Sequence, residues 1–228
     1  MIAPIALIPF ALLGALLGAD VVSFPQAMTS RPIVAATLGG WLAGHAEAGL
    51  LTGAVLELLA METLPVGASR YPEWGTASLV AGALAASGAM IRPGAIITGV
   101  FAGIATAWAG SWSMYALRRL NGVWAARALP ALESGSPRAV MTLQLRGLTA
   151  DLVRGALLTT LAIIVWTPIV EFILAHWTLD RATGHAVLAA AAAAVAGGAV
   201  WRQSHRAAGS RWYLVGGVVI GIALLAFE

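Results

Sequence analysis

Polar and ionisable residues interrupt an otherwise apolar sequence between Asp20 and Ala77. Proline and glycine break the short hydrophobic runs there, most clearly in L-P-V-G-A-S-R-Y-P-E-W-G at Leu64–Gly75. Within a membrane an unpaired polar group is costly, so these residues must face a cavity or the interior of a helix bundle. The pattern is typical of a solute-binding site that is built from broken helices.

The composition is that of an integral membrane protein. Of the 228 residues, 60% are hydrophobic and 10% are charged, whereas soluble domains carry about 25% charged residues. The absence of cysteine and lysine excludes disulfides, thiolate metal sites, Schiff-base lysines and a Walker-type phosphate loop. The net charge of +3 does not point to nucleic acid. The scattered histidines lack metal-ligand spacing, and we expect no catalytic residue, metal or cofactor.

Apolar segments recur along the whole chain, which predicts an all-α, polytopic membrane protein with one transport domain over residues 1–228. They are Ile2–Ala19, Pro32–Leu42, Ala48–Leu64, Ala77–Ile91, Pro93–Ala116, Gly155–Ala175, Ala182–Trp201 and Trp212–Phe227. A straight span needs about 20 apolar residues. Pro32–Leu42 and Ala77–Ile91 are therefore predicted to be half-helices or re-entrant segments that are buried in protein. G-x-x-x-G pairs predict close helix packing: Gly14/Gly18, Gly40/Gly44, Gly49/Gly53, Gly99/Gly103 and Gly217/Gly221.

The arginine-rich middle of the chain, Arg118–Arg154, allows two interpretations. Its apolar residues recur near helical spacing, which favours an amphipathic surface helix. A cytoplasmic connection with two short helices explains the sequence equally well. The basic loop Arg202–Arg211 is predicted to be cytoplasmic by the positive-inside rule. The loop His176–Arg181, one span earlier and nearly neutral, is then predicted to lie outside.

Glu57 lies inside the apolar run G-A-V-L-E-L-L-A. A carboxylate at membrane depth is costly unless it is paired or hydrated, so ligand binding or proton handling is favoured over a packing role. On a helix Glu62 lies about 140° around the axis from Glu57, and we interpret Glu62 as a structural residue. In Leu64–Gly75, unwound backbone, the Ser69 hydroxyl and the Trp74 ring suit a hydroxyl-rich ligand, although a plain interfacial loop fits equally well.

The end of the first span carries Asp20, Ser23 and Gln26. These residues belong either to a ligand site or to a helix end at the membrane surface. Arg31 follows closely, and two roles are open for it. It pairs with Asp20, or it marks the membrane interface.

At these residues the chain resembles the membrane-embedded IIC component of the mannose/fructose/sorbose-type phosphotransferase system. The resemblance is most specific over S-R-P-I-V-A-A-T-L-G-G-W-L-A-G-H (Ser30–His45), G-L-L-T-G-A-V-L-E-L-L (Gly49–Leu59) and P-V-G-A-S-R-Y-P-E (Pro65–Glu73). In weaker form it extends over nearly the whole chain.

The resemblance implies a sugar-translocating channel subunit that has no catalytic residue of its own, with inverted repeats and re-entrant helices. It implies a IID membrane subunit as partner, assembly as a trimer of IIC–IID units, and cytoplasmic IIA and IIB phosphocarrier proteins that phosphorylate the sugar. The implied location is the bacterial cytoplasmic (inner) membrane.

Carried over by motif, the implied sugar-binding residues are Glu57 of G-x-x-L-E, then Gly67, Ala68 and Ser69, then Glu73, and, from the segment before R-P, Asp20 and Gln26. Two alternatives remain. One is a regulatory or scaffolding membrane protein of the same fold, and the other is a proton-coupled carrier that uses Glu57.

Overall fold

The computed structural model describes residues 4–63, 70–87, 92–206 and 208–226, and within these ranges it contains helices and no strand. A short 3-10 helix, Pro4–Leu7, precedes the first α-helix. The α-helices are α1 (Ile8–Asp20), α2 (Pro32–Leu42), α3 (Ala46–Ala60), α4 (Trp74–Ser87), α5 (Ala95–Glu133), α6 (Pro137–Ala175), α7 (Arg181–Ser204) and α8 (Ser210–Ala226). The all-α prediction is confirmed.

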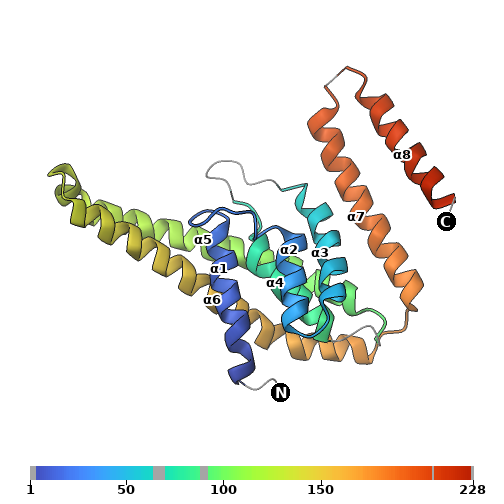
Figure 1. Cartoon of the computed structure of the whole chain (residues 1–228), viewed down its shortest axis with the longest axis horizontal. Helices are drawn as coiled ribbons and strands as arrows, with labels where there is room; N and C mark the ends of the chain where they lie inside the picture. Colours follow the sequence, from blue (N-terminus) through green and yellow to red (C-terminus); the bar gives the residue numbers. More distant parts are fainter. Residues whose placement is uncertain (1–3, 64–69, 88–91, 207, 227–228) are drawn as a thin grey trace.

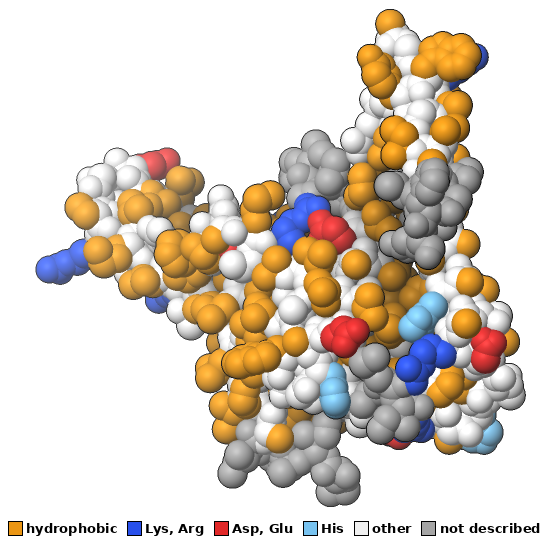
Figure 2. Space-filling view, turned by 45° about the vertical axis from the view of Figure 1, so that its right-hand side comes forward, with side chains coloured by type: hydrophobic (Ala, Val, Ile, Leu, Met, Phe, Trp, Pro, Cys, Tyr) orange, Lys and Arg blue, Asp and Glu red, His pale blue; other side chains and the backbone are white. Residues whose placement is uncertain are grey.

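Three of the described helices, α5, α6 and α7, are long and apolar enough to cross a membrane. Leucine, isoleucine, phenylalanine and tryptophan side chains are exposed along them, and hydrophobic side chains cover much of the surface in Figure 2. An exposed apolar surface of this kind is suited to contact with lipid. The chain is therefore a multi-pass membrane protein.

The predicted burial of the short helices is confirmed for α4, whereas α2 buries one face and exposes Ile33, Val34 and Trp41 on the other. α2 has the predicted bounds Pro32–Leu42, and every residue of α4 from Gly75 to Ala86 is buried. Figure 1 shows α1 to α4 clustered beside the inner halves of α5 and α6. A helix of 14 residues is too short to span the bilayer. Other parts of the protein surround α4 on all sides, so the helix is stable without contact with lipid.

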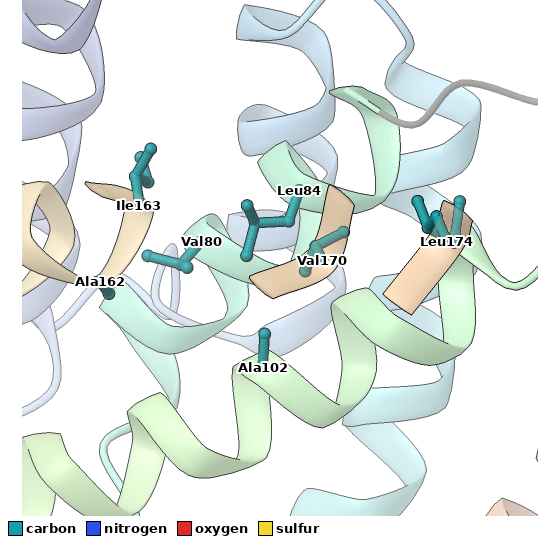
Figure 3. Close-up of a cluster of buried hydrophobic side chains, with 8 residues drawn as sticks. Val80, Leu84, Ala102, Ala162, Ile163, Val170 and Leu174 are labelled. Carbon is teal, nitrogen blue, oxygen red and sulfur yellow. The ribbon is translucent and has the colours of Figure 1, made fainter. Parts of the chain in front are cut away.

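One hydrophobic cluster joins α4, α5 and α6 at the centre of this bundle (Figure 3). It contains Val80, Leu84, Ala95, Ala102, Ala162, Ile163, Val170 and Leu174, all buried. The side chains are small to medium in size, which lets the three helices approach closely.

Glycines bring helix backbones into contact elsewhere in the bundle. A Cβ atom at Gly82 of α4 or at Gly49 of α3 would overlap the carbonyl oxygen of Ala36 on α2. The predicted close packing is confirmed at four pairs, Gly14/Gly18, Gly49/Gly53, Gly99/Gly103 and, at its first member only, Gly40/Gly44. Around Gly217 and Gly221 of α8 no described atom lies within 4 Å of an added Cβ. The packing role predicted for that pair is not seen within the chain.

The helices that both interpretations predict within Arg118–Arg154 are present, but they are longer than either interpretation expects. The cytoplasmic or membrane-surface placement of this region stays a prediction. α5 and α6 are each 39 residues long and continue without interruption through the arginine-rich region. They form a long hairpin, which extends to the left in Figure 1. The turn lies at Ser134–Ser136, where Gly135 has a positive φ and the Ser136 side chain accepts a hydrogen bond from the Ala139 amide. Alanine, leucine and arginine are strong helix formers, so both helices extend beyond the apolar segments of the sequence.

An ion pair joins the end of α7 to the end of α3. Arg202, near the end of α7, contacts Glu62, just beyond the end of α3. The structural interpretation of Glu62 is thereby confirmed. The end of α3 lies at the same side of the molecule as the start of the basic loop Arg202–Arg211.

Candidate functional site

A cavity of about 290 Å³ lies where α1 and α3 end and where α2 and α4 begin. Its wall comes from two stretches of the sequence, residues 20–32 and residues 60–74. They contribute Asp20, Val21, Gln26, Met28, Ser30, Arg31, Pro32, Ala60, Thr63, Tyr71, Pro72 and Trp74. Helices that stop inside the protein leave room and unpaired polar groups at this point. This cavity borders the region in which the sequence predicts a site of broken helices, and the binding of a solute there stays a prediction.

Asp20 organises the loop that forms one side of the cavity. Its side chain is buried, and its two carboxylate oxygens accept hydrogen bonds from the amides of Ala27 at 2.7 Å and Ser30 at 2.9 Å. The suggested pairing of Asp20 with Arg31 is wrong, because backbone amides occupy this carboxylate. Gln26 has a φ of 59° and donates its side-chain amide to the Val22 carbonyl at 2.7 Å.

Glu57 forms an ion pair with Arg31. Its second oxygen accepts a hydrogen bond from the Ile33 amide at 3.2 Å, at the start of α2. The positive end of the α2 dipole and the guanidinium both stabilise this carboxylate. Arg31 lines the cavity and Glu57 does not. Glu57 thus contacts a cation that lines the cavity without lining the cavity itself.

The opposite wall carries aromatic side chains. The Trp74 indole N–H donates to the Thr63 hydroxyl at 3.1 Å, which fixes the ring beside Tyr71 and Pro72 in the lining. The stacking surface predicted at Trp74 is present at the cavity. Gly67, Ala68 and Ser69 lie outside the described residues.

Glu73 lies behind this wall rather than in it. Its carboxylate accepts hydrogen bonds from the hydroxyl and the amide of Thr76, the latter at 3.2 Å. It therefore caps the start of α4. Its own amide donates to the Ala107 carbonyl at 2.9 Å, and it is fully buried against α5. Sugar contact by Glu57, Glu73, Asp20 and Gln26 remains a prediction.

A buried polar group that the sequence analysis missed supports the same loop from α6. The Arg154 guanidinium bonds the Asp151 carboxylate at 2.9 Å and the Gly18 carbonyl at 3.1 Å, and the Ser23 hydroxyl donates to Asp151. The i,i+3 pair in D-L-V-R was the available signal. It was overlooked because the segment was assigned to a surface helix or a cytoplasmic connection, where ion pairs are unremarkable.

Comparison with known proteins agrees with this architecture. The family model described as "PTS system sorbose-specific iic component" matches residues 4–202. One solved structure, described as "Structure of membrane protein", has a TM-score of 0.73 at 19% identity and covers 100% of this chain and 89% of that chain. A second, "CryoEM Structure of Mannose Transporter ManYZ and Microcin E492 (MceA) complex", has a TM-score of 0.64 at 21% identity, with coverages of 100% and 88%. No curated protein matches.

Proposed function

The chain belongs to the family of sorbose-specific IIC components of the phosphotransferase system, and from this premise we propose that it carries a sugar of the mannose, fructose or sorbose type across the bacterial cytoplasmic membrane. The observation that carries the proposal is the cavity at the broken helices. Its volume of about 290 Å³ is at the lower end of small-ligand pockets, about 300–1,000 Å³. That size suits a monosaccharide.

The chemistry of the lining also suits a sugar. Arg31 supplies N–H donors, and Gln26 and Tyr71 supply groups that both donate and accept. Trp74 offers an apolar ring face for the C–H side of a pyranose. Donors and acceptors of this kind around one aromatic face are what a neutral, hydroxyl-rich ligand requires.

The cavity lies at the end of α3 where Arg202 contacts Glu62. Because Arg202–Arg211 is predicted to be cytoplasmic, this cavity would open towards the cytoplasm. A sugar held there is within reach of soluble phosphorylating proteins. We therefore assign it as the position from which IIA and IIB proteins phosphorylate the sugar, with a IID membrane subunit and trimeric assembly completing the transporter. The mannose transporter among the similar structures supports this choice of sugar class.

The test is uptake of radiolabelled mannose, fructose and sorbose by cells that lack their own systems for these sugars. Expression of the chain with IID, IIA and IIB partners should accumulate sugar phosphate, and omission of IIA and IIB should abolish the accumulation. A complete set that takes up none of the three sugars would favour the regulatory or scaffolding alternative.

The isolated chain is expected to be inactive in proteoliposomes, because its short helices and small-residue faces require protein neighbours. Sugar movement by the chain alone at the rate of the assembled complex would show a self-sufficient carrier instead.

A further inference from the structure

A second cavity lies at the other end of α3, on the side predicted to face outside. It is small, about 60 Å³, and is enclosed by α3, α4, the start of α5 and the start of α7. Three of its lining side chains are Arg92, Arg181 and His185, and apolar residues such as Leu51 and Ile96 form much of the remainder. A water needs about 10–15 Å³ of such volume. The cavity therefore accommodates one compact polar group and excludes a sugar ring.

Two of the three basic side chains at this cavity have no carboxylate partner among the described residues. Arg92 pairs with Glu171 at 2.5 Å. Neither Arg181 nor His185 contacts a carboxylate within the part of the chain that the structure describes. Arg181 and His185 are four residues apart on α7, so they lie on one face of the helix.

Asp180, which precedes Arg181 in the chain, already has other partners. Its two oxygens accept hydrogen bonds from the Thr183 amide and hydroxyl, each at 2.8 Å. These bonds, above all the one from the amide, hold the pKa of Asp180 below its ordinary value. This carboxylate is therefore engaged in capping α7, and Arg181 and His185 remain at the cavity without a carboxylate partner among the described residues.

A further donor beside this cavity has no partner. The Trp177 indole lies directly over Gly94, which lines the cavity and has a φ of +88°. The indole Nε1 is buried and has no acceptor among the described residues. Buried N–H groups without acceptors are rare in proteins and indicate an unfilled partner. The indole is thus an unpaired donor close to Gly94, and Trp177 itself is not among the residues that line the cavity.

We propose that this cavity binds a phosphate group, with Arg181, His185 and Arg92 as the donors that surround it. Phosphate oxygens match the guanidinium geometry, and one phosphate replaces the few waters that the cavity holds. Two sources share this chemistry, namely the headgroup of an anionic phospholipid and free phosphate. The exposed Leu51 side chain at the rim would contact an acyl chain of the former.

The test uses the full-length protein in detergent and native mass spectrometry. Phosphatidylglycerol is compared with diacylglycerol of the same acyl chains, and a calorimetric titration with inorganic phosphate forms the second arm. The variants are Arg181→Gln and Arg181→Lys. Arg211→Gln is the matched control, because Arg211 is also an exposed arginine in the first turn of a helix.

Preferential retention of phosphatidylglycerol that falls about fivefold in Arg181→Gln, and much less in Arg181→Lys, would support the site and identify lipid as the source. Binding of inorganic phosphate that is lost in Arg181→Gln, without any lipid preference, would support the site with free phosphate as its ligand. The proposal is overturned if neither probe binds preferentially, or if Arg181→Gln and Arg211→Gln weaken binding equally.

Discussion

Replacing Glu57 with glutamine tests whether this carboxylate contacts the sugar itself or acts only by orienting Arg31. The substitution keeps the shape of the side chain and removes its charge. In the structure Glu57 touches Arg31 and the Ile33 amide, and only Arg31 reaches the cavity. We therefore expect Glu57→Gln to weaken sugar binding indirectly, by releasing the guanidinium from its fixed orientation.

The expected changes in the free energy of unfolding and in the Kd for sugar follow from the exposure of the ion pair and from the type of hydrogen bond that is lost. The side chains of Arg31 and Glu57 are 40% and 21% exposed, so solvent screens the pair and the free energy of unfolding should fall by about 1 kcal/mol or less. A hydrogen bond from a charged donor to the sugar is worth about 1.5–3 kcal/mol. If Arg31 loses that bond, the Kd for sugar should rise by roughly 10- to 100-fold. Affinity should thus change far more than stability.

The assay is equilibrium sugar binding by the purified complex, together with its melting temperature. The variants are Glu57→Gln, Arg31→Gln and the double variant. Glu171→Gln is the control, because Glu171 is the partner of Arg92 in an ion pair at the opposite end of the bundle. If Glu57 acts through Arg31, the double variant should bind no worse than Arg31→Gln alone. Additive losses would show that Glu57 contacts the sugar itself, and unchanged affinity in Glu57→Gln would refute both roles.

Three further predictions concern packing, the buried ion pair and topology. Gly82→Ala should lower the free energy of unfolding by about 1–3 kcal/mol or more, because the new methyl meets the α2 backbone; Gly197→Ala, with open space around it, should be neutral or stabilising in the same thermal melt. Arg154→Met should cost about 3–5 kcal/mol by leaving the Asp151 carboxylate buried without its cation, and pairing it with Asp151→Asn should recover part of the loss in melting temperature. A cysteine at Ser204 should resist an impermeant thiol reagent in intact cells and react after permeabilisation; labelling in intact cells would reverse the topology.

Hydropathy located the ends of helices where the apolar run and a helix-breaking residue coincide. α2 begins at Pro32 as predicted, since proline is favoured in the first helical turn. The same method failed for α5, because it placed the end of the element at Ala116, where the apolar run stops. The helix continues to Glu133 and ends only at the S-G-S-P turn. Helix propensity and turn residues, rather than hydropathy, determine this boundary.

The sequence by itself determined the class of protein, most helix positions and the region in which the cavity forms. These properties depend on local composition, since burial in a bilayer and helix breaking are decided residue by residue. Only the tertiary structure decided which polar and charged side chains bond to one another. Arg31 pairs with Glu57, 26 residues away, rather than with Asp20, and Ser23 bonds Asp151 across 128 residues. The reason is physical: the partner of a charged side chain depends on which helices pack together, and close contacts at glycines such as Gly49 and Gly82 bring distant segments of the chain together.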